Sequence, residues 1–201
     1  MNFSTSISAR VFFTCLLTIL LVAKTTFAAD WPIWGGNGSR NMVSFEKGIN
    51  LDFDPGRMDE DEVVDMKTTK NIKWIAKLGS QAYGNVTVAD GRVYAGTNNE
   101  SPRDPTKKGD RGIVMCFDEK TGKLNWQLVI PKLGAGKVSD WEYIGICSSP
   151  AIEGKRAYIV TNKCEVVCVD VEGLKNGNEG PFKSEAKYVN PKGQSAPLQE
   201  N

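Results

Sequence analysis

The residue types available for chemistry are limited by one absence, because the 201 residues include no histidine. This excludes a Ser-His-Asp triad, a Cys-His nucleophile pair, a zinc site with histidine ligands and a C-x-x-C-H haem attachment. Any reaction would therefore depend on carboxylates, lysine, tyrosine, cysteine or a bound cofactor.

One short stretch, Asp140-Trp141-Glu142, places two carboxylates around an aromatic side chain. Such a pair could ligate a hard cation or act as an acid and a base. The alternative is a solvated polar loop whose Trp141 packs on the edge of the protein, since carboxylates beside an aromatic residue are common on loops. Which of these holds depends on the elements that carry the stretch.

Those elements repeat along the chain from residue 71 onwards. Val88–Thr97 matches Ile152–Thr161 at a shift of 64 residues, and Ile113–Asp118 matches Glu165–Asp170 at a shift of 52. Short apolar runs between turn residues are typical of an all-β protein, and a repeat of this length indicates a repeat architecture.

Each repeat unit predicts four short strands. In the first unit we expect them at residues 85–88, 92–97, 113–118 and 124–129. Asp90-Gly91 and Glu153-Gly154 supply residues that tolerate positive φ at tight turns. The second unit has neither Thr-Gly nor Trp after Asp170, so its fourth strand is either lost or displaced toward Ala186–Val189.

A more specific motif follows the third strand. Cys116-Phe-Asp118-Glu-Lys-Thr121-Gly122-Lys-Leu-Asn-Trp126 resembles the A-x-D-x-x-T-G-x-x-x-W repeat of PQQ-like β-propeller proteins, in the quinoprotein alcohol dehydrogenase-like superfamily. The resemblance implies an all-β fold, a partial β-propeller built from four-stranded antiparallel PQQ-type blades. It also implies that the Trp docks on the neighbouring blade and that the turn holds it. The residues given this role are Asp118, Thr121, Gly122, Trp126 and, from a partial copy 52 residues earlier, Trp74.

The first 28 residues are typical of a secretory signal. Arg10 ends a short n-region, an apolar run covers residues 11–22, and small residues at Thr26 and Ala28 predict cleavage after Ala28. The apolar run is shorter than the roughly 20 residues that a spanning helix needs. We therefore expect an exported protein, periplasmic or extracellular, with no stable membrane span after cleavage.

The chain is expected to divide into four segments. These are a signal peptide (1–28), a Trp-rich lead-in and acidic loop (29–70), PQQ-like blades (71–171) and a loop or tail (172–201) that is an inter-blade insert or a disordered tail. Propellers close with about four to eight blades, and two are visible here. We therefore expect the chain to be the N-terminal fragment of a longer propeller.

The resemblance to propeller repeats implies that the two long connections, 98–111 and 131–145, fall on the same face of the blades. Loops of this kind carry most binding sites, so any ligand site is expected on this face, the long-loop face. The candidate residues there are Arg103, Asp104, Arg111, Asp140, Trp141 and Glu142.

In an exported protein the remaining four cysteines favour disulfides. Cys164 and Cys168 would lie roughly 13 Å apart along one strand, beyond the reach of a disulfide. Cys147 and Cys164 are the expected pair, because each opens a strand at the long-loop face. Cys116 and Cys168 are expected as buried fillers, and without a C-x-x-C pair we expect no metal site.

Two functions remain open. The first is an exported scaffold or binding protein with a protein or polysaccharide partner, no catalytic constellation and no cofactor. The alternative is part of a quinoprotein-type oxidoreductase, acting on alcohols or sugars, whose site is completed by missing blades. PQQ with calcium would then bind only in a complete propeller, and the adjacent cysteines of such enzymes are absent here. The 25 basic and 24 acidic residues nearly cancel, so nucleic acid is not an expected partner.

Overall fold

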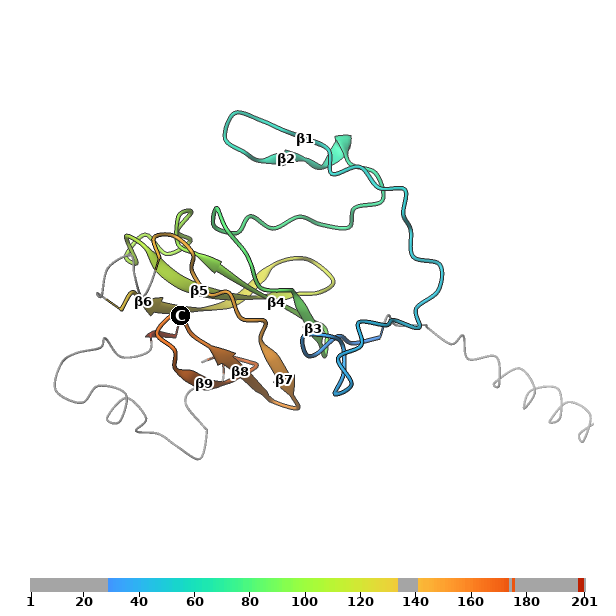
Figure 1. Ribbon diagram of the computed structural model, residues 1–201. Helices are drawn as coiled ribbons and strands as arrows, with labels where there is room; N and C mark the ends of the chain where they lie inside the picture. Colours follow the sequence, from blue (N-terminus) through green and yellow to red (C-terminus); the bar gives the residue numbers. More distant parts are fainter. Residues whose placement is uncertain (1–28, 134–140, 174, 176–198, 201) are drawn as a thin grey trace, which may run out of the picture.

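The computed structural model describes residues 29–133, 141–173, 175 and 199–200 (Figure 1). The expected signal peptide, its cleavage after Ala28 and most of segment 172–201 lie outside the described residues. Within them every regular element is a β-strand, apart from one 3-10 turn, η1 (Met66–Thr68). The all-β fold class predicted from the sequence is confirmed.

The first blade consists of four antiparallel strands: β3 (Thr87–Ala89), β4 (Arg92–Asn98), β5 (Arg111–Asp118) and β6 (Leu124–Pro131). They lie side by side in chain order, and β10 (Gln199–Glu200) adds to the outer edge of β6. The four predicted strands are confirmed. β4, β5 and β6 extend one or two residues further toward the long-loop face, because their backbone pairing continues there.

The second blade has three described strands, β7 (Ala151–Glu153), β8 (Arg156–Val160) and β9 (Val166–Asp170). They form a separate antiparallel sheet that lies against the first blade in Figure 1. The position expected for a displaced fourth strand, 186–189, lies outside the described residues.

The hairpin turn between β5 and β6 is held by Asp118. Its Oδ1 accepts hydrogen bonds from the Thr121 N–H at 2.8 Å and from the Thr121 hydroxyl at 2.7 Å. Gly122 then adopts a φ of +70°, which favours glycine. In the second blade, Asp170 Oδ1 accepts a hydrogen bond from the Glu172 N–H. The glycine with positive φ, Gly173 at +63°, comes three residues after this aspartate, whereas Gly122 comes four residues after Asp118. The second turn is therefore shorter rather than lost.

The main core lies between the two blades. Tyr94, Cys116 and Trp126 of the first blade are buried against Ile159 and Val167 of the second. These residues alternate along their strands, so each sheet gives one face to the core.

Trp126 links the blades by a hydrogen bond as well as by packing. Its Nε1 donates to the Val171 carbonyl at 2.8 Å, and its ring lies so close to Gly173 that a Cβ there would come within 2.9 Å. At the same interface Arg92 forms an ion pair with Glu172. The turn of the second blade therefore holds the tryptophan of the first.

The segment 72–78 repeats this contact on the opposite face of the first blade. Trp74 Nε1 donates to the Glu119 carbonyl at 2.8 Å, and its ring lies over Gly122. In both contacts the donor and acceptor are 45 residues apart. This agrees with the partial copy of the motif that the sequence shows around Trp74, although in the described residues the segment forms no strand of a sheet.

The lead-in crosses the inner strands of both blades. Trp31 pairs with Val88 beside β3, and the Pro32 carbonyl accepts the Ile152 N–H at 2.8 Å. Further on, β1 (Arg57–Met58) and β2 (Val64–Asp65) form a small hairpin around the acidic run. The lead-in thus contributes to both blades.

Candidate functional site

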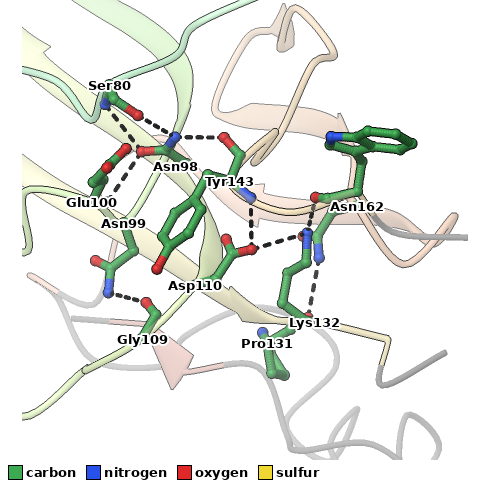
Figure 2. Close-up of polar contacts among 11 residues, drawn as sticks. Ser80, Asn98, Asn99, Glu100, Gly109, Asp110, Pro131, Lys132, Tyr143 and Asn162 are labelled. Carbon is green, nitrogen blue, oxygen red and sulfur yellow. Dashed lines mark hydrogen bonds and ion pairs between the residues drawn. The ribbon is translucent and has the colours of Figure 1, made fainter. Parts of the chain in front are cut away.

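The two long connections meet at one end of the blades, where a group of polar side chains joins them (Figure 2). Asn98 ends β4, Asp110 and Lys132 flank β5 and β6 in the two connections, Tyr143 lies in the second connection, and Ser80 comes from the segment before β3. We call this group the loop clamp; it comprises Ser80, Asn98, Asp110, Lys132 and Tyr143.

Asp110 lies at the centre of the loop clamp. Its Oδ2 accepts the Tyr143 N–H at 2.7 Å and lies 3.5 Å from the Lys132 ammonium. The side chains of Asp110 and Lys132 are only 17% and 18% exposed, so this ion pair is largely removed from water. Lys132 also donates to the Trp141 carbonyl at 2.6 Å, which ties the end of β6 to the second connection.

Asn98 is fully buried and bonds three segments at once. Its Nδ2 donates to the Ser80 hydroxyl at 2.9 Å and to the Tyr143 carbonyl at 2.5 Å, while its Oδ1 accepts the Ser80 and Glu100 N–H groups. A buried amide satisfied in this way fixes the backbone around it, because breaking any bond would leave a buried polar group unpaired.

These bonds hold a strained residue in place. Tyr143 has a φ of +54°, a left-handed conformation that costs a non-glycine residue roughly 1–2 kcal/mol. Its N–H is bound by Asp110 and its carbonyl by Asn98, which offsets that cost. The result is an ordered turn in which Trp141 is 62% exposed and Tyr143 is 40% exposed.

The predicted candidates of the first connection do not gather into one site. Arg103 donates to the Lys77 carbonyl at 2.6 Å and lies over the Phe117 ring, on the outer face of the first blade. Asp104 forms a local turn with Thr106, and Arg111 donates to the Lys108 carbonyl at 3.0 Å. The structure gives all three a role in shaping the connection.

Of the second connection, Asp140 lies outside the described residues, whereas Trp141 and Glu142 are exposed on the turn. The residues that do come together, Asp110, Asn98 and Lys132, were missed by the sequence analysis. The only signal for them was their position at strand ends, which does not distinguish a clamp from a solvated loop.

The cysteines differ from the expectations. Cys147 and Cys164 are both exposed, and the disulfide expected between them stays a prediction. Cys116 is buried as expected, but Cys168 is exposed. The expectation for Cys168 is wrong because, in the described residues, no sheet covers that face of the second blade.

The described groups with a clearly displaced pKa are Arg92, Tyr94, Cys116, Asp118 and Arg156. Burial between the blades raises the pKa of the Cys116 thiol to about 11. Hydrogen bonds from Thr121 lower the pKa of Asp118. The causes are burial and bonding in the blades and their turns, which are structural.

The described residues do not fit the PQQ and calcium site of a quinoprotein. They include no group of three or more histidine, cysteine or acidic residues placed to hold a metal ion. Adjacent cysteines are also absent from the sequence.

Comparisons with known proteins agree with the repeat. A family model described as outer membrane protein assembly factor BamB, of the PQQ repeat type, matches residues 56–171. No curated protein and no solved structure matches the chain. Across the described residues there is no helix with the length and apolar character needed to cross a membrane.

Proposed function

The chain belongs to the PQQ-type repeat family described as outer membrane protein assembly factor BamB, and from this premise we propose that it is an exported, non-catalytic scaffold. Its blades present the turn containing Trp141 and Tyr143 to a protein partner outside the cytoplasm. The family description points to a protein partner in the assembly of outer membrane proteins. A polysaccharide is the other partner considered.

The loop clamp is the observation that carries this proposal. Asp110, Asn98 and Lys132 direct their hydrogen bonds to backbone groups of the turn. A catalytic constellation would instead direct such groups toward a substrate. Here they order the turn, and two exposed aromatic side chains on an ordered turn are typical of a protein-binding surface.

Binding through an ordered turn is favourable because little conformational entropy is lost when the partner docks. Tryptophan and tyrosine also offer large contact areas with a polar atom at one end, and they are enriched among the residues that dominate binding energy. The proposal therefore assigns recognition to the side chains of Trp141 and Tyr143, and positioning to the other four residues of the loop clamp.

The test is site-specific photo-crosslinking in the envelope of the native host. A photoreactive residue at position 141 is expected to form one discrete adduct with a protein, whereas the same residue at Lys155, exposed at the opposite end of the second blade, forms none. Trp141→Ala is then expected to weaken binding of the purified partner about 30-fold, which corresponds to loss of about 2 kcal/mol.

Other results would change the proposal. Adducts of equal strength from both positions would remove the turn as the binding surface. Co-sedimentation with envelope polysaccharide, lost in Trp141→Ala, would identify that partner instead. Reproducible dye-linked oxidation of alcohols after addition of PQQ and Ca²⁺ would contradict a non-catalytic scaffold.

A further inference from the structure

Two short connections at the long-loop face contain no charged residue. Residues 79–86 (Gly-Ser-Gln-Ala-Tyr-Gly-Asn-Val) precede β3, and residues 143–150 (Tyr-Ile-Gly-Ile-Cys-Ser-Ser-Pro) precede β7. They are equivalent parts of the repeat, related by the same shift of 64 residues as the strands that follow them. Charged residues make up 24% of the chain, so their absence from both connections distinguishes this part of the face.

Both connections are held at the end of β4 by Thr97. The Thr97 hydroxyl accepts the Gly79 N–H at 3.0 Å and donates to the Gln81 carbonyl at 2.7 Å. The Thr97 carbonyl accepts the Ile146 N–H at 3.1 Å. One buried residue therefore joins the two connections.

The two connections also lie side by side along their length. At one end Asn98 bonds both the Ser80 hydroxyl and the Tyr143 carbonyl, as Figure 2 shows. Further along, a Cβ at Gly84 would come within 2.9 Å of the Cys147 carbonyl oxygen. Each contact lies four residues beyond the other in both segments, so the connections run in the same direction and form one surface. We call residues 79–86 and 143–150 the uncharged surface.

Tyr83 is exposed on the uncharged surface. It is 63% exposed, and its neighbours Ala82 and Asn85 are exposed as well. Tyr83 lies three residues beyond Ser80, the neighbour of Tyr143, and three residues span at most roughly 11 Å. The two tyrosines are therefore presented by the same surface.

The charged residues of the long-loop face lie in the neighbouring connections. They are Glu100, Arg103, Asp104, Lys107, Lys108, Asp110 and Arg111 between β4 and β5, and Lys163 and Glu165 between β8 and β9. An aromatic centre without charges, bordered by charged segments, has the composition of a protein–protein interface, in which charged residues are depleted from the core and tyrosine is enriched.

We propose that Tyr83 is a further recognition residue, and that the uncharged surface contacts an uncharged, apolar or aromatic surface of the protein partner. This inference rests on the proposed function and adds to it a second connection and the chemistry of the partner. A charged group of the partner would lose water at this surface without gaining an ion pair, which is unfavourable. The contact should therefore depend little on salt, because salt screens mainly interactions between charges.

Photo-crosslinking from position 83 tests the surface in the envelope of the native host. A photoreactive residue at Tyr83 is expected to capture the same protein as one at position 141. The matched position Lys120, exposed in the turn at the opposite end of the first blade, captures none. Tyr83→Ala is expected to weaken binding of the purified partner about tenfold. Its urea midpoint should stay unchanged, because the side chain is exposed.

A charge placed on the uncharged surface tests the chemistry of the partner. Ala82→Asp is expected to weaken binding at least about tenfold, whereas the matched variant Ala82→Ser changes it less than about twofold. Raising NaCl from about 50 mM to about 500 mM should change the affinity of the unmodified chain less than about threefold.

Each outcome has a separate meaning. Capture from position 141 without capture from position 83 overturns this inference and leaves the proposed function in place. Capture from position 83 alone keeps the uncharged surface and removes Trp141 as a recognition residue. No capture from either position overturns both. Full affinity in Tyr83→Ala or Ala82→Asp also overturns the inference, as does a steep loss of affinity with salt, which would indicate a charged partner.

Discussion

Replacing Trp126 with alanine tests whether the two blades depend on one docking side chain. Trp126 is 6% exposed, packs against Tyr94 and the second blade, and donates its Nε1 hydrogen to the Val171 carbonyl. Truncation removes the ring from the inter-blade core. It also leaves the carbonyl without this donor.

The expected loss follows from the buried area. A buried aromatic side chain covers about 200 Å², worth roughly 5 kcal/mol at 25 cal/mol per Å². Measured truncations of buried tryptophan or phenylalanine cost about 3–5 kcal/mol, because the surroundings partly relax. Trp126→Phe keeps most of the ring but loses the hydrogen bond, which costs about 1–3 kcal/mol.

The assay is urea unfolding followed by circular dichroism. With a urea dependence of about 2 kcal/mol per M, Trp126→Ala is expected to lower the midpoint by about 2 M. Trp74→Ala serves as the control, because Trp74 makes the same hydrogen bond but is only half-buried. The reasoning is refuted if Trp126→Ala costs under about 1 kcal/mol, or no more than Trp74→Ala.

Three further predictions concern the turns and the thiols. Gly122→Ala is expected to lower the free energy of unfolding in urea by about 1–3 kcal/mol more than Gly91→Ala. Both glycines have positive φ, but only at Gly122 would a Cβ meet the Trp74 ring, at 2.5 Å. Equal losses in the two variants would contradict packing of Trp74 on Gly122. The lowered pKa of Asp118 stabilises the fold above the unfolded pKa of about 3.9, and this contribution is lost as pH falls through the lower folded pKa. The stability gap between wild type and Asp118→Asn should therefore narrow from pH 6 to strongly acidic pH, and a constant gap argues against the Thr121 bonds as its source. Alkylation near pH 8, followed by peptide mass, is expected to modify Cys168 before Cys116. Cys116 is buried and has a pKa of about 11, and both features keep its reactive thiolate form scarce. Faster labelling of Cys116 would show that the two blades separate.

The strands and turns of the blades were predictable from the sequence because their causes are local. Alternation of apolar residues and the Asp90-Gly91 turn predicted β3 and β4 to within two residues. The T-G-x-x-x-W motif predicted the tight turn at Gly122 and the tryptophan that follows it. Such patterns depend on neighbours in the chain, so no tertiary information was needed.

The loop clamp was not predictable, because its partners are far apart in the chain. Asp110 and Tyr143 are separated by 33 residues, and Asn98 and Tyr143 by 45. The sequence predicted the charged residues Arg103, Asp104 and Arg111 as candidate site residues, but charge alone does not determine which side chain points inward. That depends on how the two connections pack.

The sequence alone determined the repeat, including its shift of 52 residues and the positions of Trp74 and Trp126. Only the tertiary structure decided that Cys116 is buried while its counterpart Cys168 is exposed. It also decided that Asp118-Thr121-Gly122 and Asp170-Glu172-Gly173 form equivalent turns of different length. The physical reason is that a pattern specifies which residues share a face, whereas burial depends on which surface packs against that face.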